Sequence, residues 1–218
     1  MRVDNIRRLI YRTEHYQDQK RGRLHAATTD PTWGYYVFVT AYSETAQSKL
    51  EAAVEALVLI MLRSLRSETA APYADEASKR LKLDVILDKE ALENASEDRV
   101  REEFRAQLRG LGLSDDEFMT RGIGSSRVSA CILFDEDVIE TLSKASFPDD
   151  PKRDLSAFAN VLVRIVDPKW TYPAPPTWGP GPHCRASNDW PVANLVFLYA
   201  RRSGDLMFQH NHEEEDSE

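Results

Sequence analysis

The residue types best suited to recognition gather in one irregular segment, Pro168 to Pro191. This segment holds seven of the eleven prolines and three of the four tryptophans of the chain. Prolines favour an extended conformation that aromatic grooves recognise, and large rings offer flat surfaces to a ligand or partner. The alternative is that the tryptophans fold back and cover a sheet. The candidate binding residues are Trp170, Tyr172, Trp178, His183 and Trp190.

At two places outside the predicted regular elements, imidazole or thiol groups lie close together in the sequence. Cys184 lies between His183 and Arg185, where a cation stabilises a thiolate and an imidazole can act as its base. Adjacent residues rarely aim at each other, so we assign no catalytic residue. His210 and His212 are weak candidates for metal ligands, because two imidazoles supply only half of a tetrahedral zinc shell. No cofactor is predicted.

Acidic residues flank or follow two predicted strands. They are Asp84, Asp88 and Glu90 at residues 82–88, and Asp135, Glu136 and Asp137 after residues 127–134. If these strands are parallel neighbours, both groups lie at carboxyl ends, where α/β proteins bind ligands. Such a site could hold a divalent cation or an acid–base pair. The simpler interpretation is that Asp88 and Asp135 cap helices and the other acids are solvated.

Familiar nucleotide and hydrolase motifs are missing. The sequence contains no Gly-x-x-x-x-Gly-Lys-Ser/Thr loop, no Gly-x-Ser-x-Gly elbow and no His-Glu-x-x-His helix. Gly110-Leu-Gly112 ends a predicted helix, whereas a dinucleotide fingerprint follows a strand and opens a helix. These absences exclude the common forms of several enzyme classes and leave the function open.

The elements that position these residues are organised around residues 33–65. Trp33 to Tyr42 is apolar on both alternating faces, which predicts a buried strand. Ser43 is a natural N-cap for a helix that runs to Leu65, with apolar residues at helical spacing. Further strands are predicted at 82–88, 127–134, 161–167 and 192–200, and further helices at 75–81, 96–110 and 136–144.

Strands that alternate with helices predict an α/β (α+β) fold with crossover connections. We expect a two-layer sandwich of the split β-α-β, ferredoxin-like kind, with a mixed sheet of about five strands. Because the first strand is apolar on both faces, something must also cover its second face. The basic N-terminal arm, the proline-rich segment or a second subunit could provide that cover.

Composition and charge divide the chain into three parts. Residues 1–30 form a basic arm, residues 31–204 a single α/β domain, and residues 205–218 an acidic tail. The net charge of −8 disfavours nucleic acid as a partner. Only two cysteines, no signal-peptide pattern and no apolar run of about 18 residues predict a cytoplasmic (intracellular) protein without a membrane span.

Two stretches carry a resemblance to other sequences. They are Pro31-Thr-Trp-Gly-Tyr-Tyr-Val-Phe-Val-Thr-Ala-Tyr-Ser43 and Lys82-Leu-Asp-Val-Ile-Leu-Asp-Lys-Glu-Ala-Leu-Glu-Asn-Ala-Ser-Glu-Asp-Arg-Val-Arg-Glu-Glu-Phe104. With their Trp-Gly-aromatic strand and Ser-x-x-x-Val-Arg-x-x-Phe helix, they resemble a family of uncharacterised proteins from filamentous fungi. The resemblance reaches from about residue 31 to about residue 167. It implies structural roles for these motifs, and no catalytic residue carries over.

Three functions are consistent with these features. The first is a non-enzymatic binding or interaction protein that uses the segment 168–191 to hold an unidentified protein or small molecule. The second is a small-molecule enzyme whose pocket lies between the sheet and that segment, which requires Trp178, His183 and one strand-end acid to lie together. The third is a homodimer that assembles through an exposed sheet face.

Overall fold

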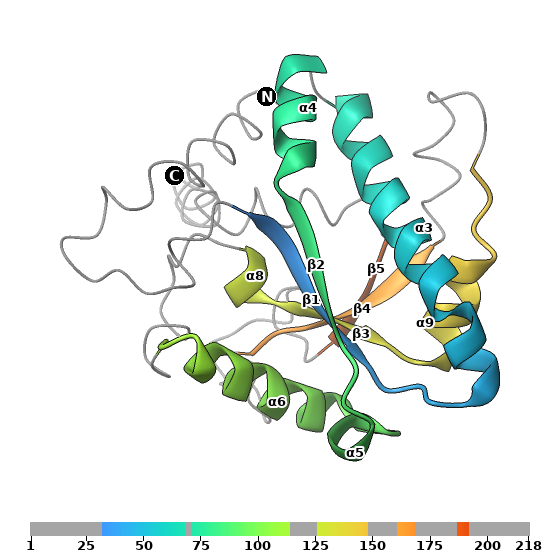
Figure 1. Cartoon of the computed structure of the whole chain (residues 1–218), viewed down its shortest axis with the longest axis vertical. Coiled ribbons are helices and arrows are strands. Elements are labelled where there is room, and N and C mark those ends of the chain that lie inside the picture. The colour runs from blue at the N-terminus through green and yellow to red at the C-terminus, as the bar shows by residue number, and fades with distance from the viewer. Residues whose placement is uncertain (1–31, 69–70, 114–125, 148–160, 169–186, 192–218) are drawn as a thin grey trace, which may run out of the picture.

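The computed structural model of this chain describes residues 32–68, 71–113, 126–147, 161–168 and 187–191 (Figure 1). Its centre is a sheet with the strand order β2-β1-β3-β4-β5. The strands are β1 (Trp33–Val39), β2 (Leu81–Ile86), β3 (Cys131–Phe134), β4 (Leu162–Val166) and β5 (Ser187–Pro191). The helices are α3 (Glu44–Glu68), α4 (Ala71–Lys79), α5 (Lys89–Leu92), α6 (Glu97–Gly110), α8 (Ser126–Ser129) and α9 (Glu136–Ser143).

The directions of the strands make the sheet mixed. β1 pairs in parallel with β2 on one side and with β3 on the other. β4 is antiparallel to β3, and β5 is antiparallel to β4. The helices α3 and α4 follow β1 and precede β2, while α5 and α6 follow β2 and precede β3. The predicted α/β class with a mixed sheet is therefore confirmed.

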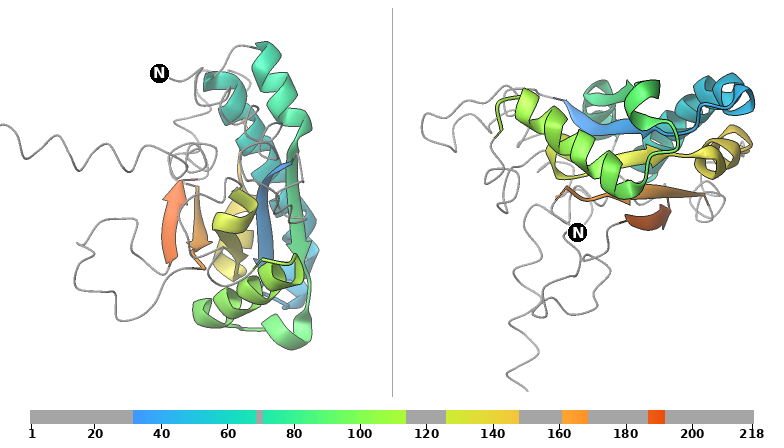
Figure 2. Two further views of the ribbon diagram at one scale, coloured as in Figure 1. Left: turned by 90° about the vertical axis from the view of Figure 1, so that its left-hand side faces the viewer. Right: turned by 90° about the horizontal axis from the view of Figure 1, so that it is seen from below.

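Helices cover both faces of the sheet (Figure 2). The helices α3, α4 and α9 share one apolar core with the β1 residues Tyr35, Val37 and Val39. The helices α5 and α6 share a second core with Tyr36 and Phe38, which point the opposite way. The structure therefore does not show the predicted two-layer, ferredoxin-like arrangement. The reason lies in β1, because a strand that is apolar on both faces needs a layer on each side.

The helix α6 supplies the second layer. Its buried apolar residues Val100, Phe104 and Leu108 recur at helical spacing, as the sequence predicts. The ring centroid of Phe104 lies 6.0 Å from those of both Tyr36 and Phe38. The sequence suggested the basic arm, the proline-rich segment or a second subunit as the cover for this second face of β1. The structure shows that α6 covers it.

Side-chain caps start two of the longer helices at the predicted positions. Ser43 Oγ accepts a hydrogen bond from Ala46 N at 3.1 Å, just before α3. Ser96 Oγ accepts from Arg99 N at 3.3 Å and caps α6. Such caps satisfy amide groups that have no partner inside the helix. Both helix starts are thereby confirmed.

Two strand predictions need correction. Residues 126–129 form the short helix α8, so the strand predicted over 127–134 begins only at Cys131. This change places Val128 in the core of α6, although an unbroken strand would place it on the opposite face with Ile132. Residues 187–191 form β5, at the end of the segment predicted to be irregular. The predicted strand at 192–200, the basic arm and the acidic tail lie outside the described residues.

The start of β1 depends on a close approach to β2. Trp33 is fully buried, and its Nε1 donates to Ala77 O at 2.7 Å. Gly34 has a φ of +133°, and a Cβ at this position would lie 2.0 Å from Lys82 O. Since both the backbone angle and the available space exclude a side chain, this position requires glycine.

Replacing Gly34→Ala should destabilise the protein by at least about 2 kcal/mol, because it strains the backbone and forces β1 away from β2. Urea-induced unfolding of the full chain measures the difference. The matched control is Gly110→Ala in α6, where an added Cβ meets nothing within 4 Å. Because alanine favours a helix more than glycine does, the control should be neutral or slightly stabilising. Equal destabilisation by the two substitutions would contradict this account of β1.

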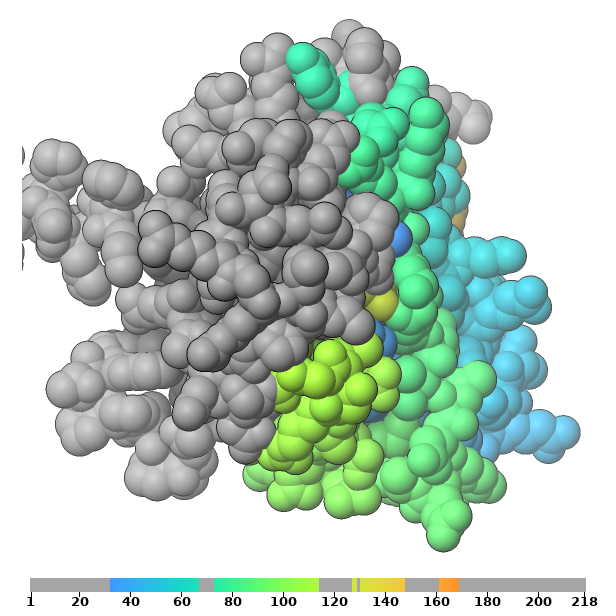
Figure 3. Space-filling view, turned by 60° about the vertical axis from the view of Figure 1, so that its left-hand side comes forward, coloured from blue at the N-terminus to red at the C-terminus, as the bar shows by residue number. Residues whose placement is uncertain are grey.

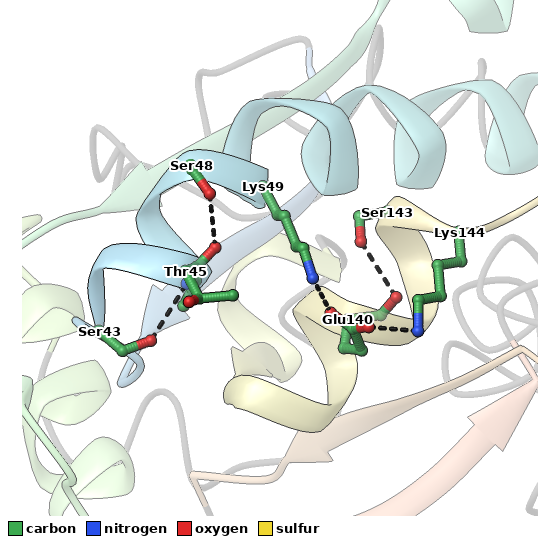
Figure 4. A network of polar contacts seen from close by, with 8 residues as sticks. Ser43, Thr45, Ser48, Lys49, Glu140, Ser143 and Lys144 are labelled. Atoms are coloured by element: carbon green, nitrogen blue, oxygen red, sulfur yellow. Dashed lines mark hydrogen bonds and ion pairs between the residues drawn. The ribbon is translucent and has the colours of Figure 1, made fainter.

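An ion-pair network joins α3 to α9 at the surface (Figure 4). Glu140 of α9 binds Lys144, one turn further along the chain, and Lys49 of α3. The hydrogen bonds from Lys144 and Lys49 lower the pKa of Glu140 from 4.5 to about 2. Because the folded-state pKa is lowered, the network stabilises the fold above pH 4.5 and loses this effect as the pH falls toward 2. Solvent screens these exposed charges, so the effect is small.

Replacing Glu140→Gln should lower the melting temperature slightly at neutral pH, since it removes the charge that holds both lysines. The difference from the unsubstituted protein should shrink as the pH falls from 4.5 toward 2. Thermal unfolding over this pH range provides the measurement, and Glu51→Gln, at an exposed position of α3, is the control. A difference that stays constant with pH would show that the carboxylate charge is not the source of the stabilisation.

Candidate functional site

A cavity of about 260 Å³ lies at the carboxyl ends of β1 and β3. Residues that follow these two strands form part of its wall, together with the first residues of α6 and α9 and one side chain of β4. In α/β sheets, ligands bind in the crevice beyond the carboxyl ends of parallel strands. The lining includes Thr40, Asn94, Glu97, Asp135, Glu136 and Arg164.

Hydrogen bonds to main-chain groups join the segments that form this wall. Thr40 N donates to Phe134 O at 2.9 Å, and the buried Thr40 hydroxyl donates to the same oxygen at 3.4 Å. Asn94 N donates to Thr40 O at 3.0 Å, which ties the turn before α6 to the end of β1. Asn94 has a φ of 54°, a left-handed angle that asparagine adopts more readily than most residues. The positions of these segments are therefore set by the backbone.

Two helices begin at the cavity from opposite faces of the sheet. The helix α6 starts after Ser96, and α9 starts after Asp135, whose Oδ1 accepts from Val138 N at 2.9 Å. The partial positive charge at a helix start favours anions. Glu97 and Glu136 occupy the first turns of these helices and offset that charge.

Arg164 brings a cation from β4 into the lining. Its Nη1 lies 2.8 Å from Asp135 Oδ2, so one carboxylate both caps α9 and holds a guanidinium. The side chains of Arg164 and Asp135 are 38% and 22% exposed. Ion pairs with such exposure stabilise a fold by only about 0–1 kcal/mol, so the main effect of this pair is to hold the guanidinium at the cavity.

The described lining carries more acid than base. The lining contains three acids, Glu97, Asp135 and Glu136, and one base, Arg164. The ion pair between Asp135 and Arg164 neutralises the charges of these two side chains. Within this set no side-chain cation binds Glu97 or Glu136, and the partial charges of the two helix starts offset only part of their negative charge. The cavity therefore suits hydroxyl and amino groups, which donate hydrogen bonds, and it repels phosphate groups.

The acids predicted at the strand ends do not form one site. Asp88 caps α5 with a hydrogen bond of 3.1 Å from a backbone amide, and Asp135 caps α9, as the capping interpretation predicts. Asp84 is paired with Arg127, which is buried. Of the predicted acids, Asp135 and Glu136 line the cavity. The two groups stay apart because β2 and β3 are not neighbours and β1 lies between them.

Most of the predicted binding residues lie outside the described part of the chain. They are Trp170, Tyr172, Trp178 and His183, together with the weak metal candidates His210 and His212. Trp190 lies on β5, where its backbone pairs with Val163. Residues 168–186 are flanked by neighbouring strands, since Val166 pairs with Ser187, whereas Pro191 at the end of the segment pairs with Leu162 at the other end of β4. Val166 also pairs with Cys131 at the start of β3, so the pair of Val166 and Ser187 lies at the end of the sheet opposite to the cavity, whereas Trp190 lies toward the cavity end.

Sequence reasoning assigned no site role to four polar residues of the lining, which are Thr40, Asn94, Glu97 and Arg164. Arg164 has a readable signal, because its charge interrupts the otherwise apolar run of residues 161–166. Thr40 and Asn94 carry no comparable signal. They reach the cavity through main-chain contacts between segments that are far apart in the sequence.

The described residues contain neither a cluster of metal ligands nor an accessible thiol. No group of three or more His, Cys, Asp or Glu side chains there could hold a metal ion. All five histidines fall in the parts that the structure does not describe. Cys131 is fully buried, and burial raises the pKa of its thiol well above the usual value. It is a core residue, as its position on a strand predicts.

Two further findings bear on the class of protein. Within the described ranges, no helix is both long enough and apolar enough to span a bilayer. Comparisons of this chain with protein-family models, with curated proteins and with solved structures find no match.

Proposed function

We propose that this chain is a binding protein for a small polar molecule, neutral or cationic, held at the carboxyl ends of β1 and β3. The observation that carries the proposal is the cavity of about 260 Å³ with its polar lining. Pockets for drug-sized ligands measure roughly 300–1,000 Å³, so this cavity suits a smaller metabolite. Its position beyond parallel strands is the usual place for a ligand in an α/β sheet.

The lining predicts how such a ligand is oriented. Glu97 and Glu136 approach from helices on opposite faces of the sheet and accept hydrogen bonds from its hydroxyl or amino groups. Arg164, held by Asp135, donates to an oxygen atom of the ligand. A phosphorylated or dicarboxylate ligand fits poorly, because it meets the carboxylates of Glu97 and Glu136.

Binding accounts for the described lining better than catalysis does. Neither histidine nor cysteine contributes to this part of the wall. Its hydroxyl groups, those of Thr40 and Ser96, make hydrogen bonds to main-chain groups. The described residues around the cavity therefore lack a nucleophile with an adjacent base.

Ligand-observed NMR on the full chain tests the proposal with two panels of small metabolites. One panel carries hydroxyl and amino groups without acidic groups, and the other carries phosphates or carboxylates. We expect binding from the first panel only. The double substitution Glu97→Gln and Glu136→Gln should weaken that binding by about ten-fold, because it removes charge but conserves shape.

The matched control is the double substitution Glu51→Gln and Glu102→Gln, which removes the same charge from exposed helix positions outside the lining. It should leave binding unchanged. Binding confined to the acidic panel, binding that is indifferent to the cavity substitutions, or no binding from either panel would contradict the proposal.

A second candidate function is the capture of a protein partner by the segment 168–191. The β4–β5 ladder supports it, because Val166 pairs with Ser187 and so holds the residues on either side of 168–186 together at one end of the sheet. Loops presented by a rigid scaffold often carry recognition, and tryptophan and proline suit a protein surface. A catalytic use of Trp178 and His183 has less support, since the acids that line the cavity lie at the opposite end of the sheet from the pair of Val166 and Ser187, between which residues 168–186 run.

Replacing Trp178→Ala together with His183→Ala should abolish capture of such a partner from a host lysate, because it removes a large contact surface. The melting temperature should stay unchanged. A pull-down with the full chain measures capture, and His210→Ala with His212→Ala in the acidic tail is the control. Undiminished capture by the first variant would rule out this candidate.

A further inference from the structure

The strand β2 is an outer strand of the sheet. In the described part of the chain it pairs with β1 alone, and the strand order ends with it. All seven residues of β1 are buried, whereas every residue of β2 is at least partly exposed. Figure 1 views the molecule with β2 in front of the other strands, and Figure 3 shows green atoms of the β2–α5 region at the surface.

The outer edge of β2 presents the main-chain groups of alternate residues. Trp33 N donates to Arg80 O at 2.9 Å, so the carbonyl group of Arg80 points toward β1. Successive carbonyl groups alternate along a strand, and Lys82 O also points inward, toward Gly34. The main-chain groups that point away from β1 are therefore those of Leu81, Leu83 and Val85.

The side chains on the two faces of β2 differ in character. Leu81, Leu83 and Val85 pack, partly buried, against the core that contains α3. Lys82 and Asp84 lie on the other face and are 49% and 29% exposed, with 3.6 Å between Lys82 Nζ and Asp84 Oδ1. The strand thus alternates aliphatic residues with two charges of opposite sign.

We propose that β2 is the docking edge for a second copy of this chain, which pairs with it in antiparallel orientation about a two-fold axis at Leu83. In this register Leu83 faces Leu83 of the second copy, Leu81 faces Val85, and Lys82 faces Asp84. Geometry requires outward-pointing residues to face each other to exchange N–H···O bonds, and an axis at Leu83 is the register that pairs all three of them. The two sheets then form one continuous sheet, and the cavity is not involved.

Charge favours this orientation and this register. Lys82 and Asp84 fall in a non-hydrogen-bonded pair, where facing side chains lie closest, and the two-fold axis creates the pair twice. Parallel in-register pairing would instead place Lys82 beside Lys82 and Asp84 beside Asp84. A lysine at a sheet edge normally discourages pairing. Here Arg127 of the same chain binds Asp84 Oδ2, and Asp84 Oδ1 is left to face Lys82 of its own chain and Lys82 of the second copy. The edge is therefore self-complementary, which makes a second copy its best partner.

Sedimentation velocity combined with hydrogen exchange of the full chain tests this proposal. We expect a monomer–dimer equilibrium. The amides of Leu81, Leu83 and Val85 should become protected from exchange as the protein concentration rises. The amides of Lys82 and Asp84 should show no such change, because they already point to β1.

Two matched pairs of variants separate association from folding. Lys82→Glu should weaken dimerisation at least about ten-fold, because it places a glutamate opposite Asp84 at both copies of this pair. The control Lys89→Glu makes the same charge change at an exposed position of α5 and should have no effect. Leu83→Pro should abolish dimerisation, because it removes an outward N–H group. Leu83→Ala loses side-chain atoms but keeps this group and should still dimerise.

Melting curves show whether each variant is folded, and Lys82→Glu alone decides the question if Leu83→Pro does not fold. A monomer at every concentration would overturn the proposal. A dimer that lacks the alternating protection, or that is insensitive to Lys82→Glu, would overturn it as well.

Discussion

Burial of β1 on both faces is the constraint on which the rest of the structure depends. Tyr35, Val37 and Val39 face the core of α3, α4 and α9, while Tyr36 and Phe38 face the core of α6. A strand with no polar face must be central in its sheet and must have a helix layer on each side. The parallel partners β2 and β3 and the two helix layers meet these requirements.

The cavity is a consequence of the same constraint. Because α6 and α9 lie on opposite faces of the sheet, their first turns approach each other beyond the carboxyl ends of β1 and β3. The antiparallel strand β4 then contributes Arg164, a side chain from within a strand, to a wall that consists otherwise of strand ends and helix starts. Asp135 links these parts, since it caps α9 and binds Arg164. A local helix cap thereby becomes part of the proposed ligand site.

The described molecule presents three surfaces with different chemistry. The cavity is polar and acidic, and it lies at one end of the sheet. The residues that flank 168–186 lie at the opposite end, where β4 stops and β5 begins. The edge of β2 is aliphatic on one face and charged on the other. Since these surfaces share no residues, ligand binding, partner capture and self-association need not compete.

Local structure was readable from the sequence because it depends on residues a few positions apart. The caps at Ser43, Ser96 and Asp135 each join a side chain to an amide three residues later, and the buried stripe of α6 repeats within one helix. The both-sided apolar character of β1 also predicted that its second face is covered. The likeness to the fungal family, the cytoplasmic location and the binding segment stay predictions.

Only the tertiary structure decided how these pieces meet. The separation of β2 from β3 by β1 kept the two acid groups apart, and no property of either strand alone encodes that order. Val128 changed core because four residues before β3 are helical, a choice in which tertiary packing outweighs the local strand pattern. Arg164 reaches the cavity because β4 runs antiparallel beside β3. Strand order and direction arise from burial summed over the whole sheet, which no short stretch of sequence contains.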